Sequence, residues 1–182
     1  NPRIYASRAA LYSSLGDYNY AIDDLNQAIR LRPKDPNLFL NRGIAYFSTG
    51  DYAKAVSDYD EALKLDPKMG PALNNRCLTR AVMGLDLDGA LADCREALTL
   101  QPGDPYTRDN MGLIYLKQKY YDKAIAEYDA SLKLDPSRAR ALYGRGFAKS
   151  KRGEAPAGIN DMTTATGIQP NIGSEFAKYG VR

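Results

Sequence analysis

Proline recurs along this chain at a nearly constant interval, and the interval constrains the fold more than any other feature of the sequence. Successive members of the series lie 34, 35, 34 and 34 residues apart: Pro33, Pro67, Pro102, Pro136 and Pro170. A fixed period of this length is typical of repeat architectures. Because each period contains two amphipathic halves, we expect stacked helix–turn–helix units.

The segment 36–67 illustrates one unit. Its first half carries a large, a small and a large residue on one helical stripe, and its second half carries a small, a large and a small one. The two sets are Phe39, Gly43 and Tyr46, and Ala55, Tyr59 and Ala62. We expect the two helices to approach closely at Gly43 and Ala55 while rings fill the flanks. Gly50 supplies the turn between the halves, and Pro67 ends the second helix.

This pattern resembles the tetratricopeptide repeat family over almost the whole chain. That family has bulky, small and aromatic residues at the fourth, eighth and eleventh places, then alanine, a bulky residue, alanine and proline at the 20th, 24th, 27th and 32nd. The unit that begins at Pro36 has the complete set: Phe39, Gly43, Tyr46, Ala55, Tyr59, Ala62 and Pro67. The resemblance implies an all-α, right-handed superhelical solenoid of antiparallel helix pairs over residues 1–182.

The expected units of this single solenoid are 2–35, 36–69, 70–104, 105–138 and 139–172, and residues 173–182 are expected to form a C-terminal capping helix. The first unit has the pattern of an interior unit, and the chain begins at Asn1 without a methionine. We therefore expect the chain to be a mature form or a fragment. In the parent protein, further repeats or a cap are expected to precede it. The compartment, cytoplasmic or periplasmic, stays open, and the C-terminal stretch resembles bacterial repeat proteins.

The composition argues against several classes of function. Hydrophobic residues make up 44% of the chain and charged residues 26%, and no apolar run is long enough for membrane insertion. The chain has no histidine, and no segment resembles a phosphate-binding loop, a dinucleotide fingerprint, a metal-ligand cluster or a nucleophile elbow. We therefore expect no enzymatic activity, no cofactor and no metal.

Basic residues are concentrated at the C-terminal end. The net charge of the chain is +3, and residues 138–182 contain 8 basic and 3 acidic residues. Such a patch suits an acidic partner or nucleic acid. Aromatic residues are not interleaved with these charges for stacking, so we favour a solvated surface over nucleic-acid binding.

Arginine and carboxylate side chains also recur at the repeat period. Arg8, Arg42, Arg76 and Arg145 share one place in the first helices, and Asp24, Asp58, Asp93, Glu127 and Asp161 share one place in the second helices. An active site is seldom copied into every repeat, so we expect structural ion pairs between helices, within a unit or to the preceding one, with Met111 as the exception.

The two cysteines, Cys77 and Cys94, fall at core places of one unit. Cysteine usage is low, so we expect both to be buried as reduced, small hydrophobic residues. A disulfide is the alternative, and it would indicate an oxidising compartment.

The inner face of the first helices is the candidate binding site. In the family, the second, fifth, sixth, ninth, twelfth and thirteenth places line a concave groove. Asparagine occupies the sixth place in three successive units, and its amide can pair with a peptide backbone of any sequence. The predicted groove residues are Asn41, Asn75, Asn110, Leu40, Ile44, Phe47, Leu78, Tyr106, Leu113, Tyr143 and Phe147. Alternatively, the asparagines bond to neighbouring backbone and serve the fold alone.

These observations favour a protein–protein interaction scaffold or adaptor that holds a peptide or helical segment of a partner in its groove. One alternative is a self-association module, a homo-oligomer in which the open N-terminal unit stacks on another copy. Another is the targeting arm of a larger enzyme whose catalytic domain lies outside this chain.

Overall fold

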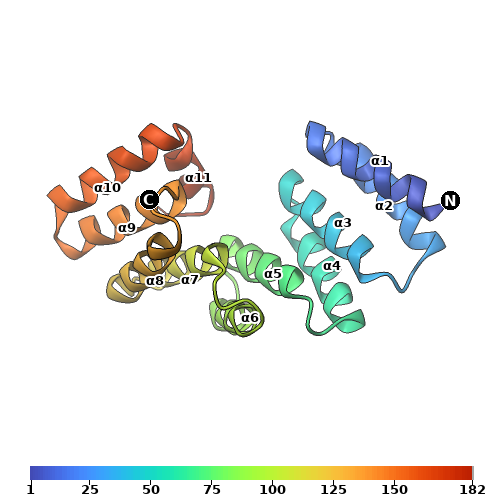
Figure 1. Ribbon diagram of the computed structural model, residues 1–182, viewed down its shortest axis with the longest axis horizontal. Coiled ribbons are helices and arrows are strands. Elements are labelled where there is room, and N and C mark those ends of the chain that lie inside the picture. Colours follow the sequence, from blue (N-terminus) through green and yellow to red (C-terminus); the bar gives the residue numbers. More distant parts are fainter. Residues whose placement is uncertain (182) are drawn as a thin grey trace. The chain divides into compact units, whose positions relative to one another are not determined.

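The computed structural model describes residues 1–181, and all regular structure in that range is helical (Figure 1). The prediction of an all-α fold is confirmed. In chain order the helices are α1 (Pro2–Leu15), α2 (Tyr18–Leu31), α3 (Pro36–Thr49), α4 (Tyr52–Leu65), α5 (Gly70–Met83), α6 (Leu87–Leu100), α7 (Pro105–Lys117), α8 (Tyr121–Leu134), α9 (Ala139–Arg152), α10 (Ala155–Ile168) and α11 (Ile172–Lys178).

The chain folds into two compact units, one from Asn1 to Thr79 and a second that begins at Arg80, within α5. In the first unit α1 packs on α2, α2 on α3 and α3 on α4. In the second unit α6 to α10 pack in the same consecutive way, and α11 packs on α9 and α10. Each expected repeat contains two consecutive helices, while one solenoid over the full length stays a prediction.

Local sequence signals explain where the helices begin and end. Asp35 is the N-cap of α3, and its side chain accepts a hydrogen bond from the backbone N–H of Asn37 at 3.1 Å. Pro36, between these two residues, occupies the first helical position. The same helix ends at Gly50, whose φ of 85° is left-handed. Glycine adopts that conformation at the least cost because it has no Cβ. Gly50 therefore allows the tight turn that leads into α4.

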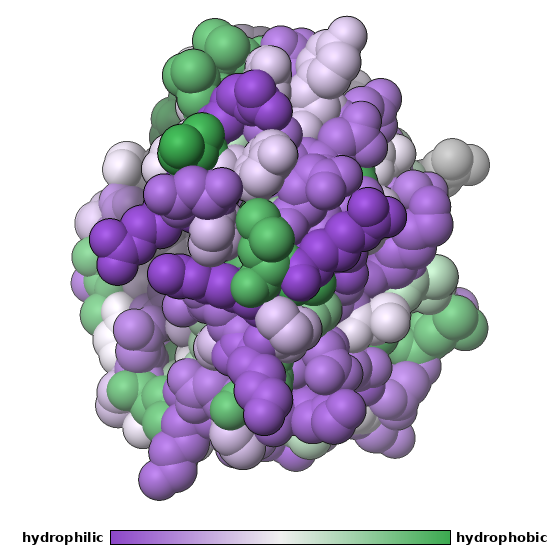
Figure 2. All heavy atoms as spheres, turned by 90° about the vertical axis from the view of Figure 1, so that its right-hand side faces the viewer, coloured by the Kyte–Doolittle hydropathy of each residue, from purple (hydrophilic) through white to green (hydrophobic). Residues whose placement is uncertain are grey.

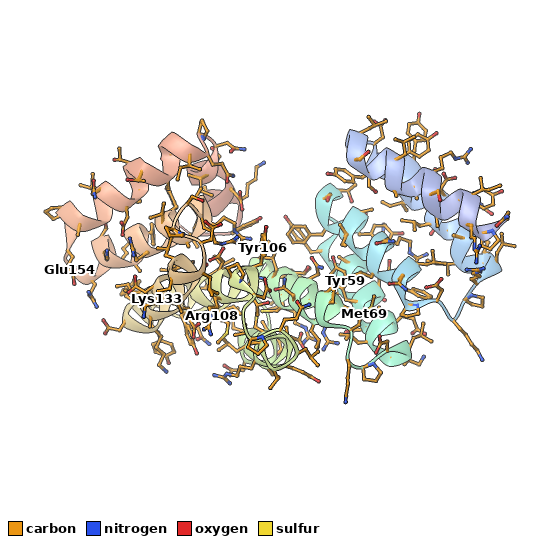
Figure 3. All side chains as sticks on the ribbon, viewed as in Figure 1. Tyr59, Met69, Tyr106, Arg108, Lys133 and Glu154 are labelled. Carbon is orange, nitrogen blue, oxygen red and sulfur yellow. The ribbon has the colours of Figure 1, made fainter. Side chains whose placement is uncertain are left out.

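In two of the helix pairs a glycine of the first helix faces a tyrosine ring of the second. Tyr59 projects from α4 toward α3 (Figure 3) and is completely buried. A Cβ added at Gly43 would lie 2.5 Å from Cε1 of that ring. The predicted small-to-large fit is therefore present, and the atoms nearest to such a Cβ belong to Tyr59. In the second unit Tyr128 of α8 is buried in the same way against Gly112 of α7.

The cysteines correct one expectation. Cys77 and Cys94 are both fully buried, as expected. Both are disulfide-bonded and neither is a free thiol, so the prediction of reduced cysteines was wrong. The physical reason is that a low cysteine count carries no information about whether a thiol becomes oxidised in the folded protein.

We expect the substitution Gly43→Ala to lower the free energy of unfolding by about 1–3 kcal/mol, because the new methyl group would overlap the Tyr59 ring. The matched control is Gly167→Ala in α10, where a Cβ would meet nothing within 4 Å and alanine should stabilise the helix by about 0.5–1 kcal/mol. Chemical denaturation of both variants checks this. Equal stability changes at the two sites would contradict the packing described here.

Candidate functional site

Arginines on the first helices of the first unit bind polar groups on two neighbouring second helices. Arg42 on α3 donates to Asp58 of α4 through Nε at 2.8 Å and Nη2 at 2.6 Å. Its Nη1 donates to Oδ1 of Asn26, on the preceding helix pair, at 2.7 Å. Arg8 makes the corresponding pair with Asp24 through Nε at 2.6 Å. These contacts confirm the predicted arginine–carboxylate pairs in this unit.

The same arrangement recurs in the second unit. Arg145 on α9 donates to both oxygens of Asp161 on α10, at 2.7 Å each, and to Asp129 on α8 at 2.8 Å. Lys149 adds a third donor to Asp161 at 2.9 Å. One guanidinium therefore joins three helices, and its bidentate geometry fixes their register.

Met111 is the expected exception and is buried without an ion pair of its own. Glu127, which faces that place in the repeat pattern, pairs instead with Arg108 at 3.2 Å. Arg76 pairs with Asp60 of the preceding helix pair at 2.7 Å. Where Met111 replaces the arginine, Arg108 therefore supplies the partner of Glu127.

The pKa shifts of the paired carboxylates agree with a structural role. The hydrogen bond from Arg8 holds the pKa of Asp24 below its usual value. Burial alone would raise the pKa of Asp161, but hydrogen bonds from Arg145 and Lys149 outweigh it and the pKa is lowered. A lowered carboxylate pKa stabilises the fold above the unfolded-state pKa, and this contribution is lost as the pH falls through the folded-state pKa.

The predicted groove residues of the first unit differ in accessibility. Asn41 is exposed and Ile44 is 38% exposed, one helical turn apart on α3. Phe47 is half-buried, with its ring centroid 5.3 Å from that of Tyr52. Leu40 is buried, so it belongs to the core more than to a surface. On this helix an amide and an aliphatic side chain are therefore available to a ligand.

On α5, the predicted groove residues of the first unit are Asn75 and Leu78, both half-buried. The Asn75 side-chain amide donates to the backbone carbonyl of Pro71, one turn earlier in the same helix, at 2.8 Å. This bond is the backbone contact that the sequence left as an alternative to ligand binding. It uses one donor of the amide, whose carbonyl oxygen is an acceptor with two lone pairs.

In the second unit two of the five predicted groove residues are buried. Asn110 is 2% exposed, and its Oδ1 accepts a hydrogen bond from Arg140 at 3.5 Å. Leu113 is 1% exposed. Tyr106 is exposed, and the guanidinium of Arg138 lies 4.1 Å from its ring centroid. The three asparagines therefore do not form a uniformly exposed row.

Tyr143 and Phe147, the two predicted groove residues of α9, are half-buried. The Tyr143 ring lies 4.8 Å, centroid to centroid, from the ring of Phe176 on α11. Phe147 lines a depression together with Gly180 and Val181, which follow α11. The C-terminal segment is thus a neighbour of both residues.

Asp109 is a buried charged residue on α7 that sequence reasoning missed. It is 1% exposed, and its Oδ2 accepts hydrogen bonds from Nε and Nη2 of Arg138 at 3.0 and 2.5 Å. Burial raises its pKa even though Arg138 opposes the shift. The only sign of this pair in the sequence is a carboxylate at a repeat position for which the pattern predicts no ion pair. Its partner, Arg138, lies 29 residues later in the chain.

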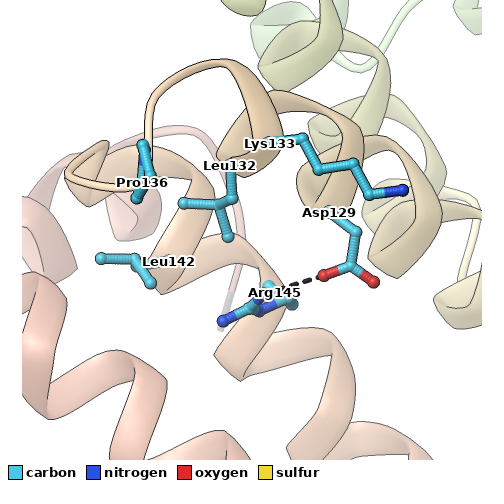
Figure 4. Close-up of a pocket in the computed structure, with 6 residues that line it drawn as sticks. All are labelled: Asp129, Leu132, Lys133, Pro136, Leu142 and Arg145. Carbon is cyan, nitrogen blue, oxygen red and sulfur yellow. Dashed lines mark hydrogen bonds and ion pairs between the residues drawn. The ribbon is translucent and has the colours of Figure 1, made fainter.

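An open depression of about 440 Å³ lies between α8 and α9 (Figure 4). Its lining consists of Asp129, Leu132, Lys133, Pro136, Leu142 and Arg145. The pair between Arg145 and Asp129 crosses this surface at 2.8 Å. None of the lining residues belongs to the predicted groove, so the depression is a separate feature of the second unit.

Within residues 1–181 no helix combines the length and apolar character that a membrane span requires. Over the same range, no group of three or more histidine, cysteine or acidic residues is arranged to hold a metal ion.

Two family models match the chain. A model described as "TPR repeat" matches residues 9–50 and 112–153, and a model described as "Tetratricopeptide repeat" matches residues 36–69. Together they cover more than half of the sequence, at the places where the helix pairs described above lie.

Two curated relatives match part of the chain. Serine/threonine-protein phosphatase 5 of Mus musculus is 30% identical over 94 residues, which cover 52% of this chain and 19% of the phosphatase. Photosystem I assembly protein Ycf3 of Acaryochloris marina is 36% identical over 83 residues, which cover 41% of this chain and 49% of that protein. The matched region thus spans about a fifth and about half of their lengths.

Solved structures share the fold over nearly the full length. A fragment of MamA from Desulfovibrio magneticus RS-1 has a TM-score of 0.80 at 21% identity, covering 93% of this chain and 96% of that one. YrrB, a TPR protein with an unusual peptide-binding site, has a TM-score of 0.69 at 20% identity, covering 97% and 89%. At these identities the likeness concerns the fold alone.

We expect Asp161→Asn to destabilise the protein by about 3–5 kcal/mol, because Arg145 and Lys149 would lose a buried anionic partner. Asp122→Asn is the matched control, since this carboxylate also accepts from an arginine, Arg152, but its side chain is 83% exposed. Its loss should cost at most about 1 kcal/mol. Thermal and urea unfolding at neutral pH measure both. A control as damaging as Asp161→Asn would show that burial does not set the strength of these pairs.

Proposed function

Because the chain belongs to the tetratricopeptide repeat family, we propose that it is a protein-interaction scaffold that holds a peptide or helical segment of a partner against its first helices. The peptide-binding site of YrrB and the assembly role in the name of Ycf3 support interaction with proteins as the general function. The phosphatase match covers 19% of that enzyme, so its catalytic activity is not carried over.

One observation carries the proposal for this chain: α3 leaves an amide and an aliphatic side chain accessible on one face. Asn41 is exposed and Ile44 is 38% exposed, three residues apart. An amide donates and accepts hydrogen bonds with any peptide backbone, and an aliphatic group next to it anchors a side chain. Arg42, between them in sequence, is engaged with Asp58 and Asn26 and does not compete for the ligand.

The proposed contact surface of the first unit combines these residues of α3 with residues of α5, the first helix of the following repeat. It consists of Asn41, Ile44, Phe47, Asn75 and Leu78. Three other predicted groove residues are buried and support the fold without contacting a ligand: Leu40, Asn110 and Leu113.

We expect Ile44→Asp to weaken the binding of peptides selected from a displayed random library by about tenfold or more, since a charge would replace an apolar anchor. Leu31→Asp is the matched control, because Leu31 is also an exposed aliphatic residue, at 54%, but lies on a second helix. Isothermal titration calorimetry measures both variants, and circular dichroism verifies their helicity. Equal affinities of wild type and Ile44→Asp for every selected peptide would remove this face from the mechanism.

Self-association is a second candidate, favoured by an apolar stripe on α1. Ile4, Leu11 and Leu15 are 63%, 57% and 67% exposed. The equivalent residues one repeat later include Leu38 and Ala45, which are 5% and 1% exposed. The stripe therefore has the chemistry of a face that another helix pair covers. Figure 2 shows the end of the first unit that carries α1 and α2, with apolar groups among hydrophilic ones.

If α1 mediates self-association, the mass measured by sedimentation equilibrium should rise with concentration and return to that of the monomer in Leu11→Glu. This substitution should leave helicity unchanged, because Leu11 is an exposed residue. A monomer at every concentration in the wild type would exclude this candidate.

A further inference from the structure

The C-terminal segment of the second unit lies against the predicted groove side of α9. Phe176 on α11 is 2% exposed, and its ring lies 4.8 Å from that of Tyr143. Oε1 of Glu175 lies 3.4 Å from Nε of Arg140. The ring of Tyr179 lies 5.7 Å from the Arg140 guanidinium. Arg140 and Tyr143 occupy the second and fifth places of their repeat, which in the family line the groove.

After α11 the chain turns back and reaches α7. Gly180 has a left-handed φ of 79°, and the next backbone N–H, that of Val181, donates to the carbonyl of Phe176 at 3.0 Å. A Cβ at Gly180 would lie 3.8 Å from Nζ of Lys117 on α7. Val181 is 8% exposed and lines a depression with Leu116 and Phe147. The segment therefore contacts two successive first helices, α9 and α7. A cap for the last helix pair alone would not need to reach α7.

The contacts of this segment leave one donor unsatisfied. Nε of Arg140 is buried and forms no hydrogen bond, although Glu175 is close enough for an ion pair. Its Nη2 donates to Asn110 at a long 3.5 Å. A carboxylate that approached in the plane of the guanidinium would gain a hydrogen bond that Glu175 does not make. The segment is thus an imperfect ligand for this surface.

We propose that residues 172–181 act as an intramolecular ligand on the α7 and α9 face, and that a helical segment of a partner binds there by displacing them. The occupant defines the partner's chemistry: a carboxylate followed directly by an aromatic residue, with an aliphatic residue five positions further, as in Glu175, Phe176 and Val181. Lys119 and Lys151 are exposed, flank the same depression and favour an acidic segment. This inference rests on the proposed function.

Displacement has a thermodynamic consequence. A tethered segment acts at an effective concentration near the millimolar range, so a free ligand competes against it. The apparent dissociation constant of a partner equals the intrinsic one divided by the fraction of molecules whose face is open. Releasing the segment should therefore tighten binding without changing any residue of the face.

The test uses the full chain and a fluorescein-labelled peptide with the sequence of residues 172–181, followed by fluorescence anisotropy. We expect Phe176→Ser, which removes the aromatic contact with Tyr143, to bind the labelled peptide at least about tenfold more tightly than the wild type. Lys178→Ser is the matched control on the same helix, because Lys178 is exposed, and it should bind as weakly as the wild type. Adding Tyr143→Ser to the released variant should abolish the gain.

A second released variant guards against misfolding of Phe176→Ser. Glu175→Arg releases the segment because it opposes Arg140 with a like charge, and it leaves residue 176 a phenylalanine. It should also bind the peptide more tightly than the wild type, with unchanged helicity by circular dichroism. The proposal is overturned if a folded released variant binds the labelled peptide no more tightly than the wild type does.

Peptides selected from the random library separate this inference from the proposed function. Selected peptides that bind wild type and both released variants equally would leave the scaffold function standing and remove the intramolecular ligand. If no library peptide binds any of these proteins, the proposed function fails, whereas tighter binding of the 172–181 peptide by the released variants would still support the intramolecular contact.

Discussion

The ring of Tyr59 fits against α3 only because residue 43 has no side chain, and this contact sets how closely the two helices of the pair approach. The corresponding contact in the second unit joins Tyr128 to Gly112. Neither helix of a pair could bury its apolar stripe by itself, so the closeness of the pair determines which side chains remain for the neighbouring pair. Accessible residues such as Asn41 and Ile44 lie where they do because the opposite side of α3 is committed to this packing.

The features that recur at the repeat period could be predicted from the sequence. N-cap residues and C-cap glycines set the helix limits, as at Asp35 and Gly50. The arginine–carboxylate pairs were also predictable, since Arg42 and Asp58 return at equivalent places in other repeats. Such features depend on contacts within one repeat or between adjacent repeats, and those contacts have a fixed separation along the chain.

Features without the period could not be predicted. Asn110 occupies the same place in its repeat as Asn41, but it is buried and accepts a hydrogen bond from Arg140, 30 residues later. The disulfide-bonded state of Cys77 and Cys94 could not be deduced from the low cysteine count. The position of Phe176 beside Tyr143 depends on how the chain turns after α10.

Arg145 makes hydrogen bonds to Asp161 in its own repeat and to Asp129 in the one before, and Arg42 likewise reaches Asp58 and Asn26. In a linear array, stability is approximately the sum of the stability of each repeat and a coupling between neighbours. Part of the coupling between neighbours therefore comes from the hydrogen bond that each of these two guanidinium groups makes to the preceding repeat. That bond is lost when the preceding repeat unfolds. Loss of order at one repeat therefore leaves a half-satisfied cation in the next, which makes partial unfolding costly and sharpens the cooperativity of melting.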